Sequence, residues 1–402
     1  MAMTTAAQAQ IRLPSLPGLP LQNVTQPLDR TGAGALDRVS DLRRQEINRL
    51  IRANRRVIDT DPAGEPVVRS EVLALSVKEE SLAPVLARGF VVDRRYTVTA
   101  ENFRVLVLRA PARWSTTQAL HELREQDPHG TFDYNHLYSG GGAGLLDQLA
   151  PAPAQRIASP GDSARPQVRV GLLDSGVDDG HPAFQSSVVH AWGCGGGRMP
   201  GSHGTAVASL LMAHATGELY AADVYCGTPT GGAVDAIVAA LGWMAEEHVA
   251  VINVSLVGPK NLLLETIVKA LIARGHILVA AVGNDGPAAP PLYPAAYSKV
   301  VGVTAVDERR RVLIEAERGP QVMFAAIGSD IQAADLGRGY GTVRGTSFAA
   351  PAVAALLAAV LPAPDPVAAQ AAIDALAKQA IDLGAPGRDL TYGFGLVGSD
   401  IR

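Results

Sequence analysis

Five nearly continuous apolar runs constrain the second half of the chain more than any other feature. They read QVRVGLLD, ELYAADVY, VAVINVSL, HILVAAVG and KVVGVTAV, and helical patterns alternate with them. A strand with one wet face alternates apolar and polar residues, whereas a continuous apolar run is buried on both faces. The sequence therefore predicts an α/β fold, with a doubly wound, mostly parallel sheet covered by helices on both faces. Functional side chains are expected at the carboxyl ends of its strands.

The chain before this region predicts a smaller α+β unit. Over residues 66–138 the pattern runs strand, helix, strand, strand, helix, strand, which is the order of a ferredoxin-like split βαβ domain. An Arg-rich helix is predicted over residues 35–56, and residues 1–34 are predicted to be a flexible tail. Gly140–Gly142 and a Pro-rich stretch at 151–166 mark the domain boundary, which we place between residues 140 and 141.

Composition and charge limit the classes of partner. The net charge of −4 over 402 residues predicts no field strong enough to attract nucleic acid. No run of 18 apolar residues occurs, so no membrane span is predicted. The segment Ala7–Ala9 resembles the end of a secretory signal without the apolar stretch that should precede it. We therefore expect a secreted or periplasmic protein whose signal peptide is missing from this chain.

Four polar residues stand where elements of the predicted sheet begin or end. Asp174 ends a strand, His203 opens an apolar helix, Asn284 follows a strand between two glycines, and Ser347 opens a very apolar helix. Each signal is weak alone, because Asp and Asn are common in turns and Ser commonly caps helices. Together they supply a carboxylate, an imidazole, an amide and a hydroxyl at one sheet edge. The order Asp, His, Ser is one of three known orders of a Ser-His-Asp triad.

Six segments, in order, resemble the catalytic domain of the subtilisin-like serine peptidases (subtilases) over residues 167–397. They are GLLDSGVDDGHPAF, GSHGTAVASLL, VINVSLVGP, VAAVGNDGP, GTSFAAPAVAALLA and YGFGLV. The resemblance implies that Ser347 is the nucleophile and helix cap, His203 the general base and acid, and Asp174 the carboxylate that orients it. Asn284 and the backbone N–H of Ser347 would form the oxyanion hole.

The module at 66–138 is similar, more weakly, to the prosegment of the same family. This resemblance implies that residues 35–140 are a prosegment acting as folding chaperone and inhibitor, and that residues 141–402 are the catalytic domain. The family boundary falls near Tyr138. We predict self-cleavage after Gly140, with Tyr138 as the alternative, because a narrow pocket would reject a tyrosine.

The expected substrate cleft departs from the family pattern at two positions. The resemblance implies that Ser255, Leu256, Val257 and Gly258 line the cleft. Val257 stands where the family has a glycine, and Leu292 stands where a glycine often floors the primary specificity pocket. Two added side chains narrow this pocket, which predicts a preference for Gly, Ala, Ser or Val before the scissile bond.

Cofactors and cross-links are expected to be few. The loop that ligates calcium in many subtilases is short here, and its one carboxylate, Glu218, provides too few oxygens. We therefore expect neither a metal nor a cofactor. Cys194 and Cys226 form either one disulfide, which would brace the segment before His203, or two free thiols.

The predicted function is that of a serine endopeptidase made as a self-processed zymogen. Its expected partners are polypeptide substrates and its own prosegment, with no nucleic acid, and we expect a monomer. A catalytically silent binding protein on the same fold is one alternative, which the complete set of four polar residues disfavours. A serine esterase is another, but Ser347 lies in GTSFA and lacks the G-x-S-x-G elbow.

Overall fold

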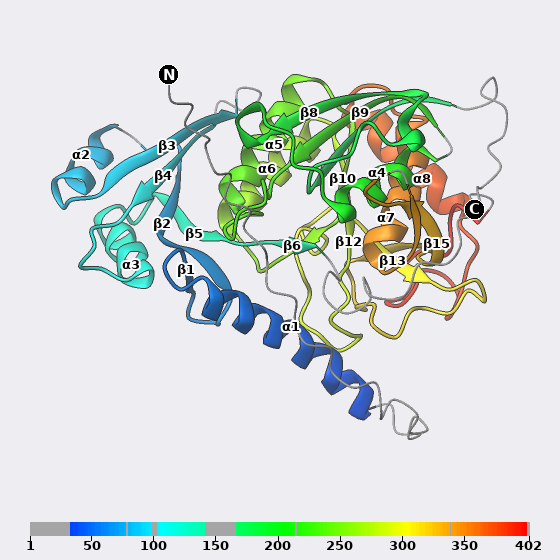
Figure 1. Cartoon of the computed structure of the whole chain (residues 1–402), viewed down its shortest axis with the longest axis horizontal. Coiled ribbons are helices and arrows are strands. Elements are labelled where there is room, and N and C mark those ends of the chain that lie inside the picture. The colour runs from blue at the N-terminus through cyan, green and yellow to red at the C-terminus, as the bar shows by residue number, and fades with distance from the viewer. Residues whose placement is uncertain are drawn as a thin grey trace, which may run out of the picture.

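The computed structural model describes residues 33–77, 79–98, 103–140, 166–213, 215–337 and 339–399. Most of the tail predicted over residues 1–34 lies outside the described residues, and its last two residues begin a helix. Most of the boundary region, residues 141–165, also lies outside them. Two parts lie side by side in Figure 1: an N-terminal part, residues 33–140, and a larger C-terminal part, residues 166–399.

The C-terminal part is built on a seven-stranded sheet in the order β14-β13-β12-β10-β7-β9-β8, and its neighbouring strands run parallel. The strands are β7 (Gln167–Asp174), β8 (Ser187–Gly193), β9 (Thr216–Asp223), β10 (Val251–Val254), β12 (Ile277–Ala281), β13 (Val301–Val306) and β14 (Val322–Ile327). A hairpin of β15 (Ser329–Ala334) and β16 (Tyr340–Arg344) follows. The parallel sheet confirms the predicted fold class.

Helices cover both faces of this sheet, which explains the continuous apolar runs. One face packs against α4 (Ser202–Met212), α7 (Thr346–Ala358) and α8 (Pro366–Gln379). The other face packs against α5 (Val234–Glu246) and α6 (Leu262–Ala273). Successive residues of β7 alternate between the two cores, with Leu172 in the first and Leu173 in the second. None of the helices in the described part of the chain is both long and apolar enough to cross a membrane.

The N-terminal part has a five-stranded antiparallel sheet, in which the elements from β2 to β5 follow the predicted order and β1 is an added strand. Its elements are β1 (Ile58–Thr60), β2 (Pro66–Leu75), α2 (Glu79–Ala87), β3 (Val91–Val98), β4 (Phe103–Arg109), α3 (Thr116–Gln126) and β5 (Thr131–His136). Central strand β2 pairs with β1, β4 and β5. One face packs on α2 and α3, and the other shares a core with α5 and α6 of the C-terminal part.

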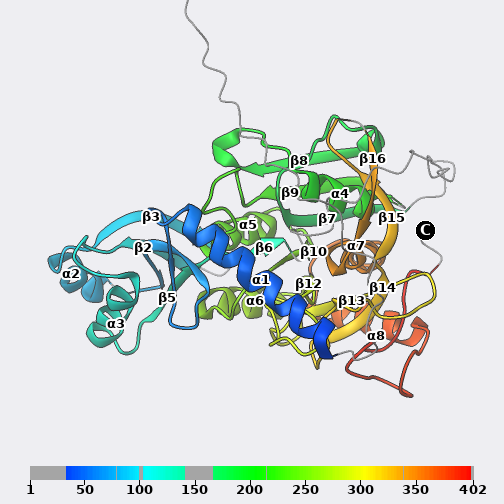
Figure 2. The same cartoon turned by 60° about the horizontal axis from the view of Figure 1, so that its bottom comes forward.

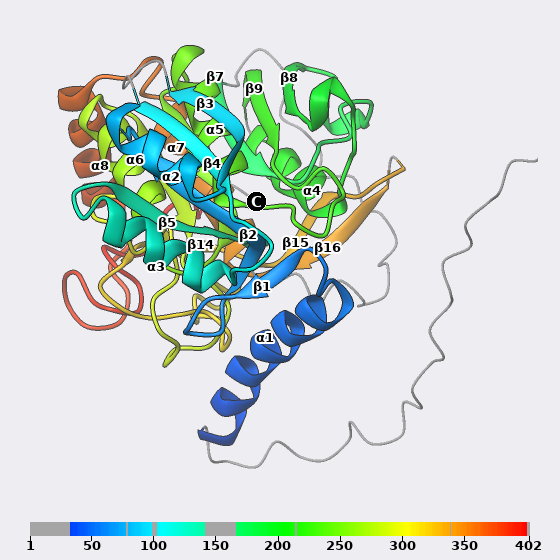
Figure 3. The same ribbon diagram turned by 90° about the vertical axis from the view of Figure 1, so that its left-hand side faces the viewer.

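Two further segments of the N-terminal part reach the carboxyl edge of the C-terminal sheet. Helix α1 (Ala33–Ala53) runs diagonally across the front of the molecule in Figure 2, passing beside β6, and Figure 3 shows it at the lower side of the molecule. Leu50 and Ile51 of α1 pack against Leu137 and against Ala233, which belongs to the C-terminal part. Strand β6 (Ser139–Gly140) pairs antiparallel with β11 (Leu256–Val257).

Candidate active site

Asp174 and His203 form a hydrogen-bonded pair at the carboxyl edge of the sheet. Asp174 is the last residue of β7, and His203 lies in the first turn of α4. Imidazole Nδ1 of His203 is 2.8 Å from Oδ1 and 2.9 Å from Oδ2 of Asp174. The carboxylate is 1% exposed, so it acts on the imidazole with little screening by water. This arrangement fixes the ring tautomer that carries a proton on Nδ1 and leaves Nε2 as a base.

The local sequence after Asp174 brings these two residues together. The backbone N–H of Ser175 donates to Asp174 Oδ1 at 2.7 Å, and Ser175 Oγ accepts from the N–H of Gly204 at 2.9 Å. A Cβ atom at Gly204 would lie 2.0 Å from the carbonyl oxygen of Ser175. Glycine is therefore required where the first turn of α4 meets the end of β7. Sequence analysis missed the role of Ser175, although it directly follows Asp174.

Ser347 lies in the first turn of α7, and the residue that follows it contacts His203. The ring of Phe348, its neighbour in the chain, lies 5.3 Å from the His203 ring, centroid to centroid. Ser347 is completely buried, and its Oγ is 3.5 Å from the carbonyl oxygen of Ser255. In return, the Ser255 hydroxyl donates to the Ser347 carbonyl at 3.0 Å.

The expectation that Ser347 also caps its helix is wrong. The N-cap of α7 is Gly345, which makes no side-chain cap bond, and Ser347 is the second residue of the helix. Gly345 has φ of +136°, a conformation that a residue with a side chain rarely adopts. The turn into α7 is therefore made by a glycine, and the hydroxyl of Ser347 is not used as a cap.

Asn284 lies at the N-terminus of the same helix. It follows β12, and its Oδ1 accepts from the N–H of Thr346 at 3.1 Å. A Cβ atom at Gly345 would lie 3.3 Å from Asn284 Nδ2, so the amide lies directly beside this turn. An N-terminal helix turn and an amide group together favour negative charge at this position.

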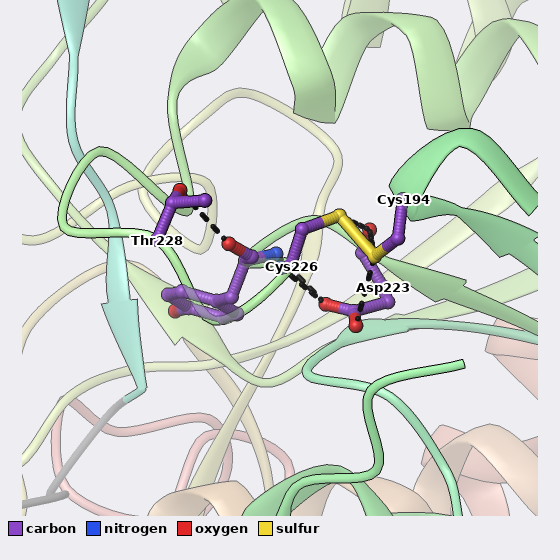
Figure 4. Close-up of a disulfide and its surroundings, with 5 residues drawn as sticks. Cys194, Asp223, Cys226 and Thr228 are labelled. Atoms are coloured by element: carbon purple, nitrogen blue, oxygen red, sulfur yellow. Dashed lines mark hydrogen bonds between the residues drawn. A yellow bond between two sulfur atoms is a disulfide. The ribbon is translucent and has the colours of Figure 1, made fainter. Parts of the chain in front are cut away.

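A disulfide links Cys194 and Cys226, with their Cα atoms 5.2 Å apart. Figure 4 shows the bond beside Asp223, whose Oδ1 accepts from the N–H of Cys226 at 2.9 Å. Cys194 follows β8, and Cys226 follows β9. The bond therefore ties the segment that leads to His203 to the loop after the neighbouring strand.

The end of the N-terminal part contacts three of the predicted cleft residues, Leu256, Val257 and Gly258. Ser139 pairs with Val257, and Gly140 pairs with Leu256. The Tyr138 side chain is 2% exposed, and its hydroxyl contacts the carbonyl oxygen of Pro259 at 2.5 Å. A Cβ atom at Gly258 would lie 2.7 Å from the Tyr138 ring, so the ring lies flat against this glycine.

Glu317 is a carboxyl group of this region that sequence analysis missed. A Cβ atom at Gly283, the residue before Asn284, would lie 2.5 Å from Glu317 Oε1 and 3.0 Å from Leu292 Cδ1. The N–H of Leu292 donates to Glu317 Oε2 at 3.3 Å. Burial, followed by the charge of Asp285, raises the pKa of Glu317 to about 9. Glu317 lies 34 residues after Gly283 in the chain, so no local pattern indicates that the two residues are in contact.

Comparison with known proteins assigns the family. The subtilase family model matches residues 165–395. The chain is 29% identical over 246 residues to the minor extracellular protease Epr of Bacillus subtilis, which covers 57% of this chain and 37% of Epr. It is 31% identical over 216 residues to subtilisin of Bacillus pumilus, covering 48% of this chain and 76% of that protein. The chain belongs to the subtilase family of serine peptidases.

The fold is also shared with solved structures. Fervidolysin from Fervidobacterium pennivorans, described as a keratinolytic enzyme related to subtilisin, superposes with a TM-score of 0.70 at 19% identity. That match covers 85% of this chain and 62% of fervidolysin, so it extends beyond the residues matched by the family model. The prenylagaramide maturation protease PagA superposes with a TM-score of 0.51 at 24% identity, covering 58% of this chain and 91% of PagA. The chain spans only part of the length of these relatives: it covers 37% of Epr and 55% of subtilisin amylosacchariticus.

Proposed function

We propose that this chain is a serine endopeptidase that cleaves polypeptides through an acyl-enzyme intermediate. The observation that carries the proposal is the buried Asp174–His203 pair, with Nδ1 2.8 Å from the carboxylate, beside the turn that holds Ser347. Membership of the subtilase family supports the same chemistry.

Ser347 Oγ attacks the carbonyl carbon of the scissile bond while His203 Nε2 accepts its proton. Asp174 holds the imidazole in the required tautomer and stabilises the imidazolium that forms. The carbonyl oxygen becomes an oxyanion, which the Asn284 amide and the Ser347 backbone N–H stabilise. The C–N bond then breaks, and His203 passes its proton to the leaving amine. Water, whose proton His203 accepts, then attacks the ester that joins the acyl group to Ser347. This second round of the same steps releases the carboxylic acid and restores the Ser347 hydroxyl.

The test uses a fluorophosphonate probe and two substrates. Wild type is expected to be labelled at Ser347 and to cleave casein faster than a simple ester. Ser347→Ala should do neither. Labelling with no casein cleavage would favour the esterase, and no labelling of an activated wild-type chain would favour a silent binding protein.

We also propose that residues up to about 140 form a prosegment that inhibits the enzyme until it is removed. Three contacts support this. Strand β6 pairs antiparallel with β11, where a substrate strand would bind. Asp133 Oδ2 accepts from the Leu262 N–H at the start of α6, and Asn135 Oδ1 accepts from the Asp235 N–H at the start of α5. Both contacts satisfy N–H groups at helix N-termini that would otherwise need water.

The register of β6 suggests where the chain is cut. Gly140 is opposite Leu256, one residue beyond Ser255, whose carbonyl contacts Ser347. We therefore place the cleaved bond after Gly140 or one residue further. Tyr138 is a poorer candidate, because its side chain is buried against Gly258, two residues further along the groove.

Self-processing is tested by expressing wild type and Ser347→Ala side by side. Wild type should gain a new N-terminus at residue 141 or 142, and the variant should remain at 41.8 kDa. Equal cleavage of both chains would show that a host peptidase makes the cut.

The disulfide between Cys194 and Cys226 fits the oxidising compartment of a secreted or periplasmic enzyme.

A further inference from the structure

An ion pair connects the segment before Ser347 with the segment that packs on Asn284. Arg344, the last residue of β16, directly precedes Gly345, the N-cap of α7. Its guanidinium binds the Glu315 carboxylate as a fork, with Nε 2.7 Å from Oε1 and Nη2 3.1 Å from Oε2. The Glu315 side chain is 14% exposed, so water screens its charge only in part. A two-pronged bond of this kind fixes the orientation of both groups as well as their distance.

The third nitrogen of this guanidinium is held by the neighbouring strand. Arg344 Nη1 donates to the hydroxyl of Ser329 at 2.8 Å, and that hydroxyl donates to Asp330 Oδ2 at 2.8 Å. Ser329 is 2% exposed and pairs with Arg344 across the hairpin of β15 and β16. The side chain of Arg344 is therefore fixed on two sides, and it presents a rigid fork to Glu315.

The backbone around Glu315 clasps the turn that carries Asn284. The N–H of Gly286 donates to the Glu315 carbonyl at 2.8 Å, and the N–H of Glu317 donates to the Gly283 carbonyl at 3.1 Å. Asn284 lies between these two bonds. Its position therefore depends on the position of the segment that Arg344 holds.

These contacts form a closed circle at the N-terminus of α7. The Thr346 N–H donates to Asn284 Oδ1 at 3.1 Å, and Thr346 directly follows the N-cap. The circle runs from Asn284 to Thr346, along the backbone to Arg344, across the ion pair to Glu315, and through Gly286 back to Asn284. Both candidate oxyanion donors, the Asn284 amide and the Ser347 backbone N–H, are attached to it.

We propose that the ion pair of Arg344 and Glu315 positions the oxyanion hole, by holding the Asn284 amide at a fixed distance from the Ser347 backbone N–H. Donors of this kind stabilise the oxyanion only if they are already in place when it forms. A displacement of about 1 Å can cost about 10²-fold in rate. Arg344 and Glu315 are positioning residues, because they act through Asn284. This inference rests on the proposed peptidase function.

In the intact chain a second ion pair holds the same turn. Arg43 Nη1 of α1 lies 3.0 Å from Oδ2 of Asp285, the residue directly after Asn284. This contact would be lost if the N-terminal part leaves, whereas Arg344 and Glu315 both belong to the C-terminal part. The positioning role therefore matters most in the activated enzyme, where the turn no longer has the support of Arg43.

The first experiment is a double-mutant cycle on the activated enzyme with one peptide substrate. Arg344→Ala should lower kcat by about 10- to 10²-fold with little change in KM, because a misplaced donor weakens binding of the transition state and not of the substrate. In a chain that already carries Asn284→Ala, the same change should cost about threefold or less, because the donor that it positions is absent. Arg311→Ala, which breaks the exposed ion pair with Asp307, is the matched control and should keep kcat.

Two kinetic results would overturn the inference. Equal losses from Arg344→Ala with and without Asn284→Ala would mean that the two residues act independently. A rise in KM with kcat retained would mean that Arg344 contacts the substrate directly.

The second experiment needs no catalysis and uses the full-length chain with Ser347→Ala and Arg43→Ala. Adding Arg344→Ala should speed hydrogen exchange of the buried Thr346 N–H by about tenfold or more, measured by NMR, whereas adding Arg311→Ala should not. Arg344→Lys keeps the charge but cannot form the fork, so it should act in the same direction, and it decides the matter if Arg344→Ala does not fold. Unchanged exchange would overturn the inference. If no peptide is cleaved, the proposed function fails, and the exchange rates alone decide on the positioning role.

Discussion

At the residue scale, the three side chains of the candidate triad should act as a unit. We expect Ser347→Ala, His203→Ala and Asp174→Ala each to lower kcat by about 10⁴-fold or more, as in other triads. A chain with all three changes should be little worse than Ser347→Ala alone, because each residue depends on the others. Circular dichroism should show the same fold in every variant. Additive losses in log kcat would argue against a triad.

Asn284 has two candidate roles, as a hydrogen-bond acceptor for Thr346 and as an oxyanion donor, and different substitutions can separate them. Asn284→Ala removes both the acceptor for the Thr346 N–H and the candidate oxyanion donor, whereas Asn284→Asp keeps only the acceptor. If oxyanion stabilisation is the main role, both variants should lose about 10²–10³-fold in kcat with little change in KM. Steady-state kinetics with one peptide substrate measures this. Near-normal activity of Asn284→Asp would mean that the contact with Thr346 is the important one.

Glu317 should make the stability of the chain depend on pH in an unusual direction. Its pKa is about 9 in the folded chain, above the ordinary value of 4.5, so the folded state keeps a proton that the unfolded state loses. Its contribution is fully present below pH 4.5 and is lost as the pH rises towards 9, by up to about 1.4 kcal/mol per pH unit. Glu317→Gln should flatten this fall between pH 6 and pH 9. Urea unfolding at several pH values measures it, and parallel curves for both chains would contradict the assignment.

Sequence could predict Asp174, His203, Asn284 and Ser347 because each lies in a short motif at an element end. It could not predict the contact of Arg43 with Asp285, because 242 residues separate them and Arg43 belongs to no motif. The same holds for Glu317, whose burial is visible only once β12 and the segment after β13 are packed together. Local sequence therefore identifies the candidate chemistry, while groups that modify it come from distant segments.

At the element scale, strands buried on both faces were predictable and strands defined by pairing were not. β7, β10 and β12 follow apolar runs, so their positions agree with prediction. Edge strand β8 mixes exposed and half-buried residues, which gives no clear pattern. The two-residue strands β6 and β11 exist only because the two parts pair with each other.

The disulfide should stabilise the segment between β8 and the loop after β9. Cys194→Ser with Cys226→Ser should lower the free energy of unfolding by about 2–4 kcal/mol, because the bond closes a loop between residues 32 positions apart. Guanidinium unfolding of the double variant and of wild type, with and without reductant, provides the measurement. Reductant should destabilise wild type and leave the double variant unchanged. Equal stability of both oxidised chains would contradict the prediction.

At the scale of the whole molecule, the contacts at helix N-termini should set how long the N-terminal part stays bound. Asn135 is fully buried and bonds to both Asp235 and Glu71. Asn135→Ala should therefore hasten the appearance of peptidase activity without moving the cleavage point. A time course of activity with N-terminal sequencing tests this. Gln45→Ala, at an exposed position of α1, is the control and should behave as wild type.

The sheet of the N-terminal part is apolar on both faces, which would determine the fate of this part if the proposed cleavage releases it. Leu73, Val105 and Val107 are completely buried against the C-terminal part, so separation would expose them to water. A small domain with one core uncovered has little stability of its own. The freed fragment should then unfold and become a substrate itself, so that activation runs in one direction and cannot be reversed by rebinding. Binding of a hydrophobic dye to the released fragment would detect this, and a fragment that stays folded and inhibitory in isolation would argue for a reversible switch.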